Sequence, residues 1–196
     1  MAQEITLFDL PSKPPNRSWS YNPWKTRIVL NYKSIPYKTH WIEFPDIAPH
    51  FESLGVPPNA QGTPYTVPTI HIPPSPSQPK GEYIVDSKAI AIALEAKYPD
   101  PPLHLDAPQL ARAEELWGQA LRALMGVFVP DVTRTLLTDR NKEYMKDRID
   151  LKTVVGGDEA WEGAKPVIEA IGLLLKEKGG PFVMGETGKS YYIIFI

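Results

Sequence analysis

The chain has 196 residues, of which 42% are hydrophobic and 22% are charged, and these values are ordinary for a globular protein of one or two domains. Its 21 basic and 23 acidic residues leave a net charge of -2, so no excess positive field attracts phosphate backbones or anionic membranes, and nucleic-acid binding is not indicated. Cysteine is absent, which excludes disulfides, thiolate metal sites and a protein thiol nucleophile, so any sulfur chemistry must come from a ligand.

The first predicted elements are a strand and a helix. Residues 5–10, ITLFDL, form a short apolar run that ends at the Pro11–Pro15 loop, as a buried strand does. Asn22 and Pro23 suit a helix cap and a first helical position. The helix predicted after them, WKTRIVLNYK, is about three turns long and repeats apolar side chains at every fourth position, namely Trp24, Ile28 and Tyr32.

The segments up to residue 98 predict three further strands and two further helices. YKTHWIEF alternates as a strand does, and a short helix is predicted after Pro45. The β-branched run YTVPTIHI and the segment GEYIVD are typical of strands, and SKAIAIALEAKY is typical of an amphipathic helix. In chain order the elements are therefore strand, helix, strand, helix, strand, strand and helix.

Beyond the proline-rich segment Pro99–Pro108, which is typical of a linker, the pattern is helical only. A further helix is predicted from about Asp139, and another over 158–178, where Gly179 and Gly180 stop it. The first helix after the linker is predicted from one apolar stripe, which consists of Trp117, Leu121, Leu124 and Phe128.

This order of elements is the layout of soluble glutathione transferases. The segments 18–47, 65–70 and 85–99 resemble the corresponding parts of the fungus-specific, etherase-related class (class A) with a serine active site, and the resemblance extends over residues 4 to about 187. It implies an α/β thioredoxin-like domain at 1–99, a linker at 100–108 and an all-α domain at 109–196. It also implies glutathione as the co-substrate, a small hydrophobic or aromatic electrophile and a homodimer.

The loop before the first helix is the predicted catalytic site, because unpaired N–H groups and the positive dipole end of a helix favour an anion there. In the family pattern, Ser20 matches the serine that holds the glutathione sulfur, Ser18 is the alternative, and Asn22 is a second donor. A bond from a hydroxyl to a charged acceptor contributes about 1.5–3 kcal/mol, which covers most of the roughly 2.7 kcal/mol needed to lower the thiol pKa by about two units. Serine and asparagine are also ordinary helix caps.

Two further segments match the glutathione-binding pattern. Pro68 lies in a strand-like run, where proline is expected only at an edge or special turn. The thioredoxin fold makes this proline cis, and the resemblance implies that the Val67 backbone pairs with the cysteinyl part of glutathione as an added strand. Asp86 and Ser87 precede a helix, and the resemblance implies that Ser87 binds the glutamyl carboxylate while Asp86 attracts the ammonium. An ordinary trans proline and a plain N-cap are the alternatives.

Aromatic residues beside the serines are candidates for the electrophile pocket, although such clusters more often belong to a core. The four histidines are scattered and show no metal-ligand spacing, so no metal is expected. Glu4 stands where a secretory signal would be basic, and no apolar run approaches the roughly 20 residues of a membrane span, so a cytoplasmic protein is expected. The pocket candidates are Trp19, Tyr21 and Trp24.

The last residues depart from the family pattern, which continues into a capping box and a long buried helix. Residues 188–196, GKSYYIIFI, are β-rich and apolar, and Gly188-Lys189-Ser190 can be back-translated to include GTAAGT, typical of an intron donor. The hypothesis is a retained intron and an incomplete helical domain. The side chains expected to lose a partner helix are the Trp117 to Phe128 stripe, Ile168, Leu173 and Leu174.

The sequence therefore predicts a glutathione transferase in which Ser20 stabilises a thiolate that attacks an apolar electrophile, by conjugation or ether cleavage. Two alternatives remain at this point. One is a non-catalytic carrier of aromatic compounds, and the other is an inactive product of truncation.

Overall fold

The structure is a computed structural model, and it describes residues 4–76, 78–146, 148, 155–180, 183 and 185. The chain divides into two compact units, Met1–Pro101 with Leu137–Met145, and Pro102–Leu136 with Lys146–Ile196. Within the described ranges, no helix combines the length and the apolar character that crossing a membrane requires.

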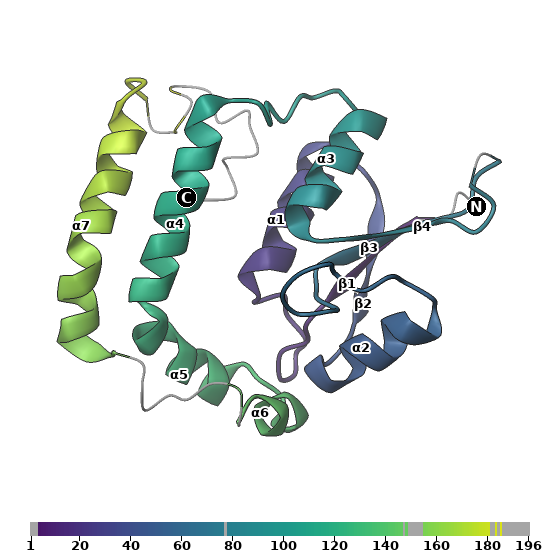
Figure 1. Cartoon of the computed structure of the whole chain (residues 1–196), viewed down its shortest axis with the longest axis horizontal. Coiled ribbons are helices and arrows are strands. Elements are labelled where there is room, and N and C mark those ends of the chain that lie inside the picture. Colours follow the sequence, from purple (N-terminus) through teal and green to yellow (C-terminus); the bar gives the residue numbers. More distant parts are fainter. Residues whose placement is uncertain are drawn as a thin grey trace. The chain divides into compact units, whose positions relative to one another are not determined.

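The first unit contains a four-stranded sheet in the order β2-β1-β3-β4. Strand β1 is parallel to β2, whereas β3 is antiparallel to both β1 and β4. In Figure 1, α1 and α3 lie on one face of this sheet and α2 lies on the other. This is the thioredoxin-like arrangement, and the predicted order is confirmed: β1 (Ile5–Asp9), α1 (Tyr21–Tyr32), β2 (Tyr37–Trp41), α2 (Phe44–Ser53), β3 (Thr69–Ile72), β4 (Glu82–Val85) and α3 (Ser87–Lys97).

Successive residues of β1 point to opposite sides of the sheet, so the strand contributes buried side chains to both faces. Leu7 is fully buried, together with apolar side chains of α1, α3 and β3. Its neighbour Phe8 belongs instead to a cluster that includes α2. We call this second group the α2-face cluster, and its buried members are Phe8, Leu10, Ile42, Ile47, Phe51 and Val56.

Helix α1 begins earlier than predicted. Ser20, not Asn22, is the N-cap residue, with an extended backbone at φ -77° and ψ 129°. The Ser20 carbonyl accepts a hydrogen bond from the backbone N–H of Trp24 at 3.2 Å. Pro23 lies inside the first turn, where its missing N–H costs nothing because the first four N–H groups of a helix have no intrahelical partner.

Helix α6 (Asp139–Met145), which the sequence prediction placed in the helical domain, packs on α2 in the first unit. The side chain of Asn141 is buried, and its Oδ1 accepts a hydrogen bond from the Phe44 N–H at 2.8 Å. Arg140 pairs with Glu43 and Asp46, and the rings of Phe44 and Tyr144 stack with centroids 6.0 Å apart.

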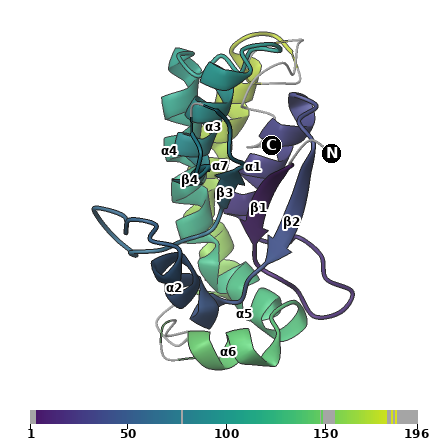
Figure 2. The same cartoon turned by 90° about the vertical axis from the view of Figure 1, so that its right-hand side faces the viewer.

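The second unit is helical. Figures 1 and 2 show α7 (Gly157–Lys176) running alongside α4 (Pro108–Ala123), and α5 (Met125–Thr135) also contacts α7. The predicted stripe from Trp117 to Phe128 does not form one face, because the chain turns at Leu124 between α4 and α5. Just beyond this turn, the Val155 carbonyl lies so close to Gly126 that a side chain at position 126 would collide with it.

The expected loss of a partner helix is wrong for Leu174, which is buried on α7 with an exposed fraction of 2%. Leu173 and Ile168 are exposed, at 64% and 42%. The predicted tail, residues 188–196, lies outside the described residues.

Candidate functional site

The loop between β1 and α1 carries both candidate serines to the start of helix α1, and the two side chains have different surroundings there. Ser20 is half-buried at the N-cap of α1, and its side chain makes no capping hydrogen bond. The hydroxyl is therefore not used by the helix that it precedes. Asn22 is exposed in the first turn of the same helix.

The Ser18 hydroxyl is engaged in an ionic network. It donates to Oδ2 of Asp9 at 2.7 Å and accepts from Nε of Arg27 at 3.0 Å. Asp9 is fully buried at the end of β1 and forms an ion pair with Nη2 of Arg27 at 2.8 Å. The Ser18 carbonyl accepts from the indole of Trp24 at 3.1 Å. Hydrogen bonds thus hold both the side chain and the backbone carbonyl of Ser18.

Asp9 and Arg27 were not among the predicted site residues. A signal for Asp9 was present, because it is a charged residue inside the apolar run ITLFDL, and buried carboxylates are nearly always paired. Its partner could not be chosen from the sequence, because Arg27 lies 18 residues further along the chain.

The segment before β3 has the predicted cis peptide bond between Val67 and Pro68. Pro68 is buried, and its carbonyl accepts a hydrogen bond from the Asp86 N–H at 3.2 Å. The antiparallel pairing of Thr69 with Val85 also places the start of β3 beside the end of β4. Two of the predicted glutathione-binding segments are therefore neighbours.

Asp86 is the N-cap residue of α3, and its carboxylate accepts from the N–H groups of Lys88 and Ala89 at 2.9 and 3.2 Å. Its backbone has φ 79°, a region that residues other than glycine rarely adopt and that often marks functional sites. Ser87 is buried at the first helical position. Asp86 itself remains exposed, so its charge is accessible from solvent.

One residue in or next to each of the three predicted segments packs on the α2-face cluster. Trp19 precedes Ser20, Val67 precedes Pro68, and Val85 precedes Asp86, and these three side chains pack on the same cluster. The fold thus gathers residues that lie up to 66 positions apart in the chain.

The three aromatic candidates have different environments. The Trp19 indole donates to the Pro11 carbonyl at 3.1 Å, in addition to its packing on the cluster. The ammonium of Lys25 lies 4.4 Å from the centre of the Tyr21 ring. Trp24 is 43% exposed, and its ring is the most accessible to a ligand of the three. Within the described part of the chain, no group of three or more histidine, aspartate or glutamate side chains is arranged to hold a metal ion.

Comparison with known proteins relates this geometry to one family. The N-terminal domain of glutathione S-transferases matches residues 19–97. The glutathione S-transferase-like protein ustS of Aspergillus flavus is 36% identical over 221 residues, which cover 98% of this chain and 77% of that protein.

Solved structures agree. The glutathione S-transferase CsGST63524 of Ceriporiopsis subvermispora, in complex with glutathione, matches with a TM-score of 0.79 and 32% identity, covering 98% of this chain and 82% of that chain. CsGST83044 of the same fungus, also in complex with glutathione, matches with a TM-score of 0.79 and 28% identity, covering 100% of this chain and 84% of that chain. The chain therefore belongs to the glutathione S-transferase family, and its enzyme class is glutathione transferase.

Proposed function

We propose that Ser20 donates a hydrogen bond to the thiolate of glutathione, which then attacks a hydrophobic or aromatic electrophile. The observation that carries this assignment is the contrast between the two serines. The Ser20 side chain makes no capping bond at the start of α1, whereas the Ser18 hydroxyl is engaged by Asp9 and Arg27.

The remaining contacts to glutathione follow from the two segments beside β3 and β4. The Val67 backbone pairs with the cysteinyl part of the ligand, next to the buried Pro68. Ser87, at the start of α3, binds the glutamyl carboxylate, and the exposed carboxylate of Asp86 attracts the ammonium. Asn22 is a second donor near the sulfur, and Trp19, Tyr21 and Trp24 line the electrophile pocket. Support comes from the Asp86 to Pro68 hydrogen bond and from glutathione in the two matched fungal structures.

The energy of such a site is sufficient without a general base. A hydroxyl bonded to a thiolate contributes about 1.5–3 kcal/mol, and the helix N-terminus adds about 0.3–1 kcal/mol. Each pKa unit corresponds to about 1.4 kcal/mol. The bound thiol is thus expected to ionise about two units below the roughly 8.5 of a free cysteine, so turnover rises with pH through this lowered pKa and then levels off.

The test replaces Ser20 with alanine and measures the ultraviolet absorbance of enzyme-bound thiolate against pH. Ser20→Ala is expected to raise the pKa of bound glutathione by roughly one to two units and to reduce turnover at neutral pH by tenfold or more. Ser53→Ala is the matched control, because the exposed Ser53 hydroxyl donates to the His50 carbonyl at 2.7 Å and takes no part in the proposed site. An increase in the pKa in Ser18→Ala but not in Ser20→Ala would transfer the assignment to Ser18.

The finer properties implied by the family resemblance belong to the same proposal. They are a homodimer, a cytoplasmic location and the cleavage of aromatic ethers in addition to conjugation. Light scattering of the purified chain tests the dimer, and cell fractionation tests the location. Parallel assays with an aryl ether and an aryl halide, each with glutathione, separate the two reactions.

A further inference from the structure

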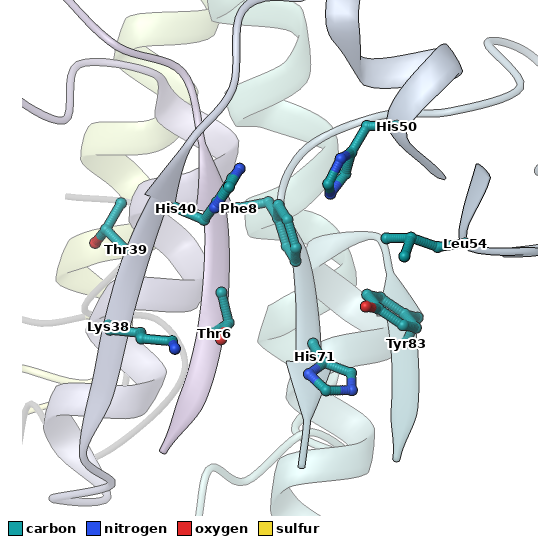
Figure 3. Close-up of a pocket in the computed structure, with 9 residues that line it drawn as sticks. All are labelled: Thr6, Phe8, Lys38, Thr39, His40, His50, Leu54, His71 and Tyr83. Atoms are coloured by element: carbon teal, nitrogen blue, oxygen red, sulfur yellow. The ribbon is translucent and has the colours of Figure 1, made fainter. Parts of the chain in front are cut away.

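The face of the sheet that carries α2 also holds a cavity of about 380 Å³, lined by residues of all four strands and of the end of α2 (Figure 3). None of the residues proposed to bind glutathione lines it. Its volume is near the lower end of the roughly 300–1,000 Å³ of small-molecule sites. The cavity is therefore large enough for a small organic molecule.

The register of the sheet explains which side chains meet there. Thr6 of β1 pairs with Lys38 of β2 on one side and with His71 of β3 on the other, and His71 pairs with Tyr83 of β4. These residues form one row across all four strands, on the same side of the sheet in Figure 3. Phe8 and His40 lie two residues further along their strands and share this face.

The ionisable side chains that line the cavity are mainly basic. Three of the four histidines of the chain line the cavity, together with Lys38, and among the described lining residues there is no aspartate or glutamate. The lining also offers hydroxyl groups and the apolar surfaces of Phe8 and Leu54. A lining with donors and no acidic side chain of its own favours an anion, and the rings favour a planar apolar body.

One polar atom of the lining lacks a partner. Nε2 of His50 is buried and makes no hydrogen bond to any described residue. The His50 ring stacks on His40 with centroids 5.5 Å apart, and it lies 5.4 Å from the ring of Phe8. Because buried polar groups in folded proteins are nearly always bonded, this nitrogen indicates a ligand or an ordered water in the cavity.

We infer that this cavity binds a small planar organic anion, an aromatic carboxylate or a molecule of the same chemistry. Its charged group is held by Lys38 and the His71 imidazole, which lie on either side of Thr6 in one row of the sheet. Its ring lies against Phe8 and extends toward His50, at the other end of the cavity (Figure 3). This site is separate from the proposed glutathione site, and it does not depend on the role of Ser20.

Two ionisable groups of the lining have shifted pKa values. Burial, and then the neighbouring His50 and Lys38, lowers the pKa of His40, so its charged form needs an anion nearby. Tyr83 stays neutral, since burial raises its pKa. The hydrogen bond and charge of Arg140, and then the charge of His50, lower the pKa of Asp46 on α2, and Asp46 is paired with Arg140.

The experiment titrates the glutathione-saturated chain with benzoate at about pH 6, and follows the imidazole and Tyr83 resonances by NMR. Benzamide is the neutral probe of the same shape, and inorganic phosphate is an anion without a ring. Lys38→Met and His50→Gln test the lining. Lys97→Met and His104→Gln are the matched controls, because neither residue lines the cavity.

Saturable shifts of His50, His71 and Tyr83 with benzoate, but not with benzamide, are expected. Each lining variant should weaken benzoate binding about tenfold, with glutathione affinity unchanged. If phosphate bound with the same affinity as benzoate, the aromatic ring of the ligand would have no role in binding. No saturation, equal shifts at His104, or displacement of glutathione by benzoate would overturn the inference. Ser20→Ala should leave benzoate binding intact, so failure of either proposal is recognised separately.

Discussion

At the scale of single residues, a buried ion pair holds the loop that carries both serines. The Asp9 carboxylate accepts from the Leu10 N–H at 2.7 Å, from the Ser18 hydroxyl and from Arg27. Arg27 also donates to the hydroxyl of Thr39 at 2.9 Å. Because its polar atoms are bonded on several sides, the pair tolerates burial, and it connects β1, β2 and α1 to the loop.

Asp9→Asn is therefore expected to lower the free energy of unfolding by about 3–5 kcal/mol, because Arg27 would keep its charge in a nearly closed site. Urea denaturation measures this change. Lys165→Met is the control, since Lys165 forms a solvent-exposed pair with Glu162, and such pairs contribute less than about 1 kcal/mol. Equal effects of the two substitutions would show that the Asp9 network does not support the fold.

At the scale of elements, a residue distant in sequence caps α2. Helix α2 starts after Glu43 without a side-chain cap from its own N-cap residue. Asn141 of α6 supplies the acceptor for the Phe44 N–H instead. The side chain of Asn141 is fully buried, so water cannot replace the bond if it is removed.

Asn141→Ala is expected to cost about 1–3 kcal/mol, the typical penalty for a buried donor left without a partner. Hydrogen exchange should be faster at the start of α2, and circular dichroism should show a lower melting temperature. Gln119→Ala serves for comparison, because Gln119 is exposed on α4. Unchanged exchange at Phe44 would mean that Asn141 does not stabilise the helix start.

At the scale of the whole molecule, each of the two units has buried apolar residues of its own. Leu7, Ile70 and Ile90 are fully buried in the first unit, and Leu174 is buried in the second. The glutathione-binding residues proposed above all belong to the first unit. Damage to the helical unit and damage to glutathione binding are therefore separable by experiment.

Two adjacent leucines of α7 give a matched pair for this purpose. Leu174→Ala is expected to destabilise the chain by about 2–5 kcal/mol, because it leaves a cavity in a packed site. Leu173→Ala should change the stability by no more than about 0.5 kcal/mol, since Leu173 is exposed. Calorimetric melting measures both, and retention on a glutathione matrix should persist in each folded variant. Similar melting shifts for the two variants would contradict the burial of Leu174.

Local patterns in the sequence were enough to predict the strands and helices of the first unit in their order, because apolar periodicity and proline act over a few residues. The same local rules misplaced the start of α1, since both Ser20 and Asn22 are good caps. They also joined α4 and α5 into one stripe, because the apolar spacing continues across Leu124, where one helix ends and the next begins.

By itself, the sequence determined the element types, the absence of a protein thiol, and the serine, proline and aspartate segments that the family pattern singles out. Tertiary structure alone decided which hydroxyl is engaged, which cation neutralises Asp9, and which side chains meet across the sheet. Sheet register and long-range ion pairs join residues far apart in the chain. No local preference encodes these pairings, so they exist only once the chain has packed.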